Sequence, residues 1–237
     1  MSFSSYVITM SSVLELRYFD GKGAVETSRL LMAISGMPYT DTRWPMDMSK
    51  PYGQRCPGFM AAKGSGELQA NLDRAPILIV DGVPIGQSAA IERFLARHVG
   101  LHGANEVEAA LVDCFVEHIR DLKELHSKAQ DRSQFMQETL PTFLAKMEAV
   151  AGEAYVVGPK LTLADVALYQ LIVDYFPSRE AYLQTKDDGS RHEASPDASN
   201  AGSILDGMPR LAAAVEAVRS HPAVVRHVSN RKYSAPW

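Results

Sequence analysis

The chain has 237 residues, enough for one large domain or two small ones with a hydrophobic core. Its formal net charge is only −4, with acids and bases interspersed, so a nucleic-acid partner is not favoured. No stretch approaches the roughly 20 apolar residues that a membrane span needs, so we expect no membrane partner.

Cysteine and histidine usage indicates a reducing compartment and no metal chemistry. Cys56 and Cys114 match neither a disulfide framework nor a metal-ligand spacing, and we expect one loop thiol and one buried helix thiol. The seven histidines are scattered, so no metal site is expected. Residues 1–12 lack the basic and apolar regions of a signal peptide, which predicts a cytoplasmic protein.

The first hundred residues predict alternating strands and helices. Alternating apolar and polar residues indicate a strand, apolar residues spaced by three and four indicate a helix, and glycine and proline interrupt both. Ser88 is expected to cap the last helix of this part. The expected elements are a strand at 13–19, a turn at 20–23, a helix at 24–35, a strand at 39–44, a loop with at most a short helix at 45–71, strands at 76–80 and 83–85 joined by an Asp-Gly turn, and a helix at 89–99.

From about residue 103 only helical patterns remain. Thr162 and Asp165 have the spacing of a capping box ahead of an apolar run. The polar stretch 185–203 predicts a mobile surface insert. The expected helices lie at 106–127, 133–151, 163–175 and 208–220, with a short one after Pro222. The sequence thus predicts a mixed sheet followed by an appended helical domain.

Four short motifs keep one order along the chain. They are Leu-Arg-Tyr-Phe-Asp-Gly-Lys-Gly at 16–23, Ala-Pro-Ile-Leu-Ile-Val-Asp-Gly at 75–82, Gln-Ser-Ala-Ala-Ile at 87–91, and the pair Thr162 and Asp165. With these motifs the chain resembles the cytosolic glutathione S-transferases of the Tyr type, most closely the mu and sigma classes. Each motif is common by itself, so the resemblance rests on all four in order.

This resemblance implies a fold and an assembly. The fold is an α/β thioredoxin-like N-terminal domain with a mixed four-stranded sheet at 13–100, followed by an all-α C-terminal domain at 104–237. The protein would be a detoxification enzyme without a cofactor, because glutathione is its co-substrate. It would be a homodimer, since in mu- and sigma-like enzymes an acid of the partner subunit holds the γ-glutamyl amine. Alignment places that acid at Asp121, with Asp113 as a competitor.

Tyr18 is the match for the family's catalytic tyrosine. A free thiol has a pKa of about 8.5, so only a few per cent is ionised at pH 7. Lowering that pKa by about two units makes the thiolate the major form, worth roughly 2.7 kcal/mol. A phenolic hydroxyl that donates to the sulfur does this without adding charge. The alternative is that Tyr18 is a half-buried core residue of its strand.

Other glutathione contacts are carried over by the same resemblance. Pro76 is expected to be cis, so that Ala75 presents its backbone to the cysteinyl part of glutathione. Gln87 and Ser88 lie at a helix N-terminus and are expected to hold the γ-glutamyl carboxylate. Phe19 stands where mu enzymes carry tryptophan and sigma enzymes phenylalanine.

The glycine end of glutathione is the least matched part. The family holds it with a tryptophan and a lysine four residues apart. Phe59 and Lys63 keep that spacing, but Phe59 has no indole N–H to donate. The substitutes are Arg55, Arg74 and, if the loop folds back, Trp44.

The second substrate is expected to be a small hydrophobic electrophile that contacts Gly21, Leu122 and Lys123, which are taken as surface-like positions. Glutathione-dependent isomerase or peroxidase activity is an alternative, although Ala24 replaces a sigma-class arginine and so argues against prostaglandin isomerase chemistry. A non-catalytic ligand-binding protein of the same fold is another. A thioredoxin-type redox protein is disfavoured, because residues 18–24 contain no cysteine.

Overall fold

The computed structural model describes residues 12–177 and 204–234, which divide into two compact units. The N-terminal unit contains residues 12–99 and, from the far end of the chain, 232–234. The C-terminal unit contains the described residues between 100 and 231. Residues 232–234 group with the first unit because their contacts are with it.

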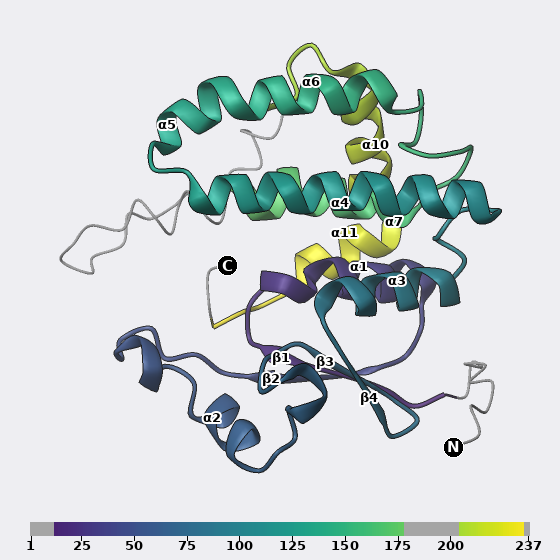
Figure 1. The fold of residues 1–237 in the computed structure, drawn as a ribbon. Helices are drawn as coiled ribbons and strands as arrows, with labels where there is room; N and C mark the ends of the chain where they lie inside the picture. Colours follow the sequence, from purple (N-terminus) through teal and green to yellow (C-terminus); the bar gives the residue numbers. More distant parts are fainter. Residues whose placement is uncertain (1–11, 178–203, 235–237) are drawn as a thin grey trace. The chain divides into compact units, whose positions relative to one another are not determined.

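The N-terminal unit is built on a mixed four-stranded sheet, as predicted (Figure 1). Its strand order is β2-β1-β3-β4, with β1 (Leu14–Phe19) parallel to β2 (Thr40–Trp44). Strand β3 (Ile77–Val80) is antiparallel to both β1 and β4 (Val83–Gly86). Strands β3 and β4 are joined by the Asp-Gly turn at 81–82 that the sequence predicts.

Strand alternation divides the apolar side chains between the two faces of this sheet. Leu16 pairs with Leu78, and both are fully buried. The helices α1 (Glu26–Ser35) and α3 (Ser88–His98) lie side by side on this face (Figure 1). A short 3-10 turn, η1 (Gly23–Val25), leads from β1 into α1. This face therefore carries the main core of the unit.

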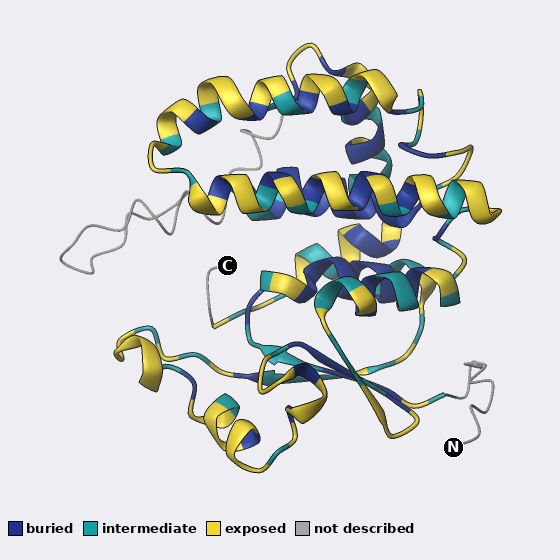
Figure 2. Cartoon of the chain, viewed as in Figure 1, coloured by how far each residue is buried: buried dark blue, intermediate teal, exposed yellow. Residues whose placement is uncertain are grey.

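The opposite face is covered by the segment 45–71. It contains η2 (Tyr52–Gln54), the helix α2 (Pro57–Gly64) and η3 (Gln69–Asn71). Most of this segment is exposed, as the yellow ribbon in Figure 2 shows. It is held by a small apolar cluster whose buried members are Trp44, Cys56, Ala62, Leu68 and Ile77.

The described part of the C-terminal unit is helical, as predicted. The helix α7 packs against both α4 and α10. Two of the predicted helices continue through π-helical stretches, η4 and η5. The predicted insert at 185–203 lies outside the described residues. The elements are α4 (Glu106–Lys128), α5 (Arg132–Gln134), η4 (Phe135–Thr139), α6 (Leu140–Val150), α7 (Leu163–Tyr169), η5 (Gln170–Tyr175), α10 (Pro209–Arg219) and α11 (Pro222–Asn230).

The predicted capping box is present at the start of α7. The carboxylate of Asp165 accepts from the Thr162 backbone N–H at 2.7 Å and from the Thr162 hydroxyl at 2.9 Å. It also accepts from the Val156 N–H at 2.7 Å. Burial raises the pKa of Asp165 to about 6, and the hydrogen bonds it accepts oppose that rise.

Two local expectations are wrong. The residue that precedes α3 is Gln87, and Ser88 is the first residue of the helix rather than its cap. The loop thiol, Cys56, is the buried one and the helix thiol, Cys114, is exposed. Within residues 12–177 and 204–234, no group of three His, Cys, Asp or Glu side chains is placed to hold a metal ion. No helix there is both long and apolar enough to cross a membrane.

Candidate active site

Tyr18 lies at the end of β1 with its ring across the turn that follows. The strand alternation puts it on the same face as Leu16, towards the start of α1. Its hydroxyl oxygen accepts a hydrogen bond from the Ala24 N–H at 3.1 Å. Gly23 has φ +42°, and a Cβ added there would lie 2.5 Å from the Tyr18 hydroxyl. Glycine is therefore required at 23 by both the backbone and the ring above it.

The turn between Tyr18 and Gly23 is fixed by buried polar contacts. The carbonyl of Gly21 accepts from the Arg29 guanidinium at 2.6 Å. Arg29 also donates to the carboxylate of Asp41 at 3.0 and 3.2 Å. Gly21 is buried, so the expectation that it is a surface-like position is wrong. The backbone beyond Tyr18 is thus held against α1 and β2.

Three segments expected to bind glutathione meet at one end of the sheet. The last row of paired residues there is Arg17, Ile77 and Gly86. Tyr18 and Gln87 come one residue after this row in their strands, and Pro76 comes one residue before it. Because β3 is antiparallel to both neighbours, all three lie at the same sheet end. The register thus brings the three motifs together.

The peptide bond between Ala75 and Pro76 is cis, as predicted. The buried Asn71, 4% exposed, binds the residues that flank β3 and β4. Its side-chain N–H donates to the Pro76 carbonyl at 2.9 Å, and its side-chain oxygen accepts from the Gln87 N–H at 3.2 Å. A Cβ on Gly86 would lie 2.6 Å from the Asn71 side chain. No sequence pattern predicts this role of Asn71, because it depends on where the folded chain places Pro76 and Gln87.

Gln87 has an unusual backbone for a residue with a side chain. Its φ is 66° and its ψ is 116°, a conformation that costs free energy for a non-glycine residue. Its side chain is exposed, and the neighbouring Ser88 is half-buried at the first turn of α3. The N–H groups of that turn and the helix dipole favour an anion here.

Phe19 and Phe59 lie together on the other face of the sheet. Their ring centroids are 4.9 Å apart, and Phe59 is 5.7 Å from Trp44. The loop therefore does fold back onto Trp44. Lys63 is exposed in the last turn of α2. Of the substitutes, Arg55 donates to the Lys50 carbonyl at 2.9 Å.

The remaining predicted residues belong to α4 in the C-terminal unit. Asp121 is exposed, whereas its competitor Asp113 lies 2.9 Å from the ring nitrogen of His102. Leu122 is fully buried, so the expectation of a surface-like position is wrong for it. Lys123 donates to the side-chain oxygen of Gln170 at 2.6 Å.

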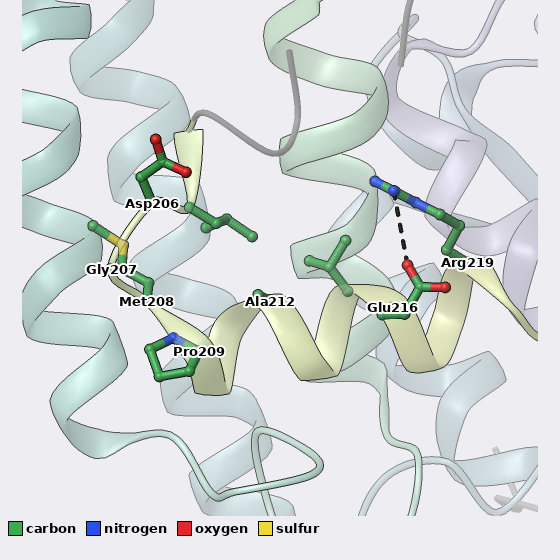
Figure 3. A pocket seen from close by; sticks show the side chains of 9 residues that line it. Asp206, Gly207, Met208, Pro209, Ala212, Glu216 and Arg219 are labelled. Carbon is green, nitrogen blue, oxygen red and sulfur yellow. Dashed lines mark ion pairs between the residues drawn. The ribbon is translucent and has the colours of Figure 1, made fainter. Parts of the chain in front are cut away.

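The C-terminal unit also carries a separate groove of about 480 Å³ (Figure 3). It runs along α10 and the turn before it, from Asp206 and Met208 to Glu216 and Arg219. The last two side chains form an ion pair at 3.7 Å. None of the residues predicted to bind a substrate lines this groove.

Comparisons with known proteins agree on one family. The family model described as "Glutathione S-transferase, C-terminal domain" matches residues 113–231. A glutathione S-transferase of Dirofilaria immitis is 30% identical over 167 residues, which is 66% of this chain and 74% of that protein. A glutathione S-transferase of Plasmodium falciparum is 27% identical over 239 residues, which is 95% of this chain and 99% of that protein. The rat protein named glutathione S-transferase alpha-1 is 29% identical over 193 residues, which is 74% of this chain and 79% of that protein.

Solved structures show the same likeness. A monomeric glutathione S-transferase of the hookworm Necator americanus has a TM-score of 0.65 and 27% identity, over 92% of this chain and 97% of that one. A Pi-class glutathione S-transferase of Onchocerca volvulus has a TM-score of 0.67 and 24% identity, over 92% and 93%. At that identity the second structure shows the fold alone.

Proposed function

Since the chain belongs to the glutathione S-transferase family and is a glutathione transferase, we propose that Tyr18 stabilises the thiolate of glutathione for attack on small hydrophobic electrophiles. One observation carries this proposal. The Tyr18 hydroxyl lies over the 3-10 turn η1 that precedes α1, at the sheet end where the cis Pro76 and Gln87 also lie.

The proposed step is a nucleophilic attack by sulfur. The bound thiol releases its proton to water, and the Tyr18 hydroxyl donates a hydrogen bond to the thiolate. The sulfur then forms a bond to the electrophilic carbon, and a group such as chloride leaves with its bonding electron pair. Because the Tyr18 oxygen already accepts from the Ala24 N–H, its own O–H is polarised and becomes a better donor.

The proposed binding mode follows the three segments at the sheet end. The backbone of Ala75 pairs with the cysteinyl part of glutathione. The γ-glutamyl carboxylate binds at the first turn of α3 through Gln87 and Ser88, and the free N–H groups at that helix start support this. Lys63 is the proposed partner of the glycine carboxylate, because it is an exposed cation one turn after Phe59.

We also propose an oligomeric state, a transferase class and a cellular location for the protein. A homodimer would let Asp121 of the partner subunit reach the γ-glutamyl amine, and the exposure of Asp121 on α4 supports this. The hookworm relative is described as monomeric, so association needs its own measurement. A mu- or sigma-like class rests on the motifs alone, since the two relatives above whose names give a class are alpha and Pi. A cytoplasmic location is likewise proposed.

The test is conjugation of glutathione to 1-chloro-2,4-dinitrobenzene between about pH 6 and pH 8, a range that separates a free thiol from one with a lowered pKa. The Tyr18→Phe variant should lose at least about tenfold in rate near pH 6.5, with its pH profile shifted upward. Tyr52→Phe, at an exposed tyrosine of the same unit, is the matched control and should behave as the wild type.

Two other outcomes have a clear meaning. Equal rates for wild type and Tyr18→Phe would remove Tyr18 from the chemistry. A wild-type chain that binds glutathione without converting this electrophile would favour the isomerase, peroxidase or ligand-binding alternatives.

A further inference from the structure

The last described residues of the chain return to the N-terminal unit. Tyr233 donates its hydroxyl proton to the carboxylate of Glu26 at 2.6 Å, across 207 positions of sequence. Its ring centroid lies 5.2 Å from the guanidinium carbon of Arg29 and 4.9 Å from that of Arg43. Both are within the range of a cation–π contact. Tyr233 thus bridges α1 and β2.

Ser234 contacts the turn that follows Tyr18 directly. Its backbone N–H donates to the Asp20 carboxylate at 2.8 Å, and its hydroxyl donates to the Asp20 carbonyl at 3.2 Å. The Met46 N–H donates to the Ser234 hydroxyl oxygen at 3.0 Å. The carbonyl of Lys232 accepts from Arg43 at 3.2 Å. Each residue of the C-terminal segment 232–234 therefore makes polar contacts with this unit.

The Tyr233 hydroxyl serves as the hydrogen-bond donor to a carboxylate that is buried. Glu26 and Arg29 are both fully buried, and their charged groups lie 3.6 Å apart. Burial, followed by the charge of Glu26, raises the pKa of the Tyr233 hydroxyl. That hydroxyl therefore remains a proton donor to the buried carboxylate throughout the working pH range. A donor at this place stabilises a charge that solvent does not reach.

A continuous set of contacts joins this segment to the Tyr18 hydroxyl. Arg29, beneath the Tyr233 ring, donates to the carbonyl of Gly21. Ser234 holds Asp20, the residue before Gly21. These two residues lead into Gly23 and Ala24, on which the Tyr18 ring and hydroxyl lie. The first two residues of the turn at 20–24 are thus held by Ser234 directly and by Tyr233 through Arg29.

We propose that Tyr233 and Ser234 are positioning residues for the transferase reaction: they lock the turn at 20–24 and so aim the Tyr18 hydroxyl at the glutathione sulfur. This inference rests on the proposed role of Tyr18. It places part of the catalytic geometry in the last residues of the chain, where neither residue touches the substrate.

Two truncated chains test the proposal, because they differ only by these two residues. One ends at Ser234 and keeps every contact described above, and the other ends at Lys232. For each, the conjugation rate with 1-chloro-2,4-dinitrobenzene is measured against pH, together with the ultraviolet absorbance of the thiolate of bound glutathione.

The chain ending at Ser234 should match the wild type. The chain ending at Lys232 should lose about tenfold in kcat near pH 6.5, with its profile shifted up by about one pH unit, while KM for glutathione changes less than about threefold. The rates should converge at alkaline pH, where the thiol ionises unaided. A merely structural loss would lower the rate equally at every pH.

Point variants keep the test decisive if the shorter chain does not fold. Tyr233→Phe retains the ring against the two arginines, and Ser234→Ala removes only the hydroxyl, so both should show the same upward shift to a smaller degree. An active wild type with unshifted profiles in the variants overturns this inference alone. A wild-type chain that binds glutathione and leaves its thiol un-ionised overturns the role of Tyr18 and this inference with it.

Discussion

Asp165 and Asn71 are buried polar side chains, one in each unit, whose hydrogen bonds span different lengths of sequence. In the C-terminal unit, Asp165 binds Thr162, three residues away, and closes the first turn of a helix. In the N-terminal unit, Asn71 binds Gln87 across 16 residues, and Tyr233 binds Glu26 across 207. The local contact secures a helix, whereas the distant contacts set the relative position of segments that meet at the sheet end. Stability and catalytic geometry therefore depend on different residues, and substitutions can separate them.

The largest effect is expected for Asp165→Ala. This change leaves buried donors of Thr162 and Val156 without their acceptor, which should lower the free energy of unfolding by about 3–5 kcal/mol. Urea unfolding followed by circular dichroism measures it. Glu153→Ala, at an exposed position before α7, is the control and should stay within about 0.5 kcal/mol. If Asp165→Ala lowers the free energy of unfolding as little as the control does, the claim that Asp165 stabilises the C-terminal unit is wrong.

The next effect is the pH dependence of the same carboxylate. Its pKa is about 6 in the folded chain against 3.8 in a free side chain, so the folded state holds a proton that the unfolded state releases. The stability that this proton confers is complete below about pH 4 and is lost as the pH rises through about 6. Relative to Asp165→Asn, which does not titrate, the wild type should lose up to about 3 kcal/mol across that window. A difference that is constant with pH would show that the carboxylate titrates normally.

A smaller effect is expected for Asn71→Ala in the other unit. The variant removes the bridge between the Pro76 carbonyl and the Gln87 N–H, so the two segments proposed to bind glutathione lose their spacing. KM for glutathione should rise about tenfold, equivalent to about 1.4 kcal/mol, with less change in kcat. Gln69→Ala, an exposed residue of the same 3-10 turn, is the control. An unchanged KM would mean that the cis-proline segment holds its place unaided.

The smallest expected effect, about 1 kcal/mol, comes from a matched pair of glycines. Gly23 and Gly36 both have positive φ, but an added Cβ meets the Tyr18 hydroxyl at 23 and nothing within 4 Å at 36. Both alanine variants should lose about 1 kcal/mol of stability for the backbone. Only Gly23→Ala should also lower kcat, because it displaces the hydroxyl. Equal activity in the two variants would show that kcat does not depend on the contact between the Tyr18 hydroxyl and the turn.

The sequence was informative where the controlling interactions are local. Period-two and helical patterns predicted the four strands and most helices, and the Thr162–Asp165 spacing predicted the capping box. The cis peptide bond before Pro76 followed from the family resemblance. The burial of Leu122 was accessible too, because Phe115 and Ile119 precede it at helical spacing and share its buried face.

The sequence was uninformative where distant segments decide a role. No local pattern distinguishes Asn71 from any polar residue of a loop, since its role appears only with its partners Pro76, before β3, and Gln87, before α3. The stacking of Phe59 on Phe19 and Trp44 likewise depends on how the 45–71 segment folds back. Tyr233 is the extreme case, because almost the whole chain separates it from Glu26.

The return of residues 232–234 makes the helical unit an insertion within the sheet unit. A tensile force applied between β1 and Ser234 would therefore run through the sheet unit and leave the helices unstretched at first. The first rupture would release Tyr233 from Glu26, and only then would the helices bear load. In a mechanical sense the chain is a closed loop, and the contact that closes it lies at the start of α1, directly after the turn that contacts Tyr18.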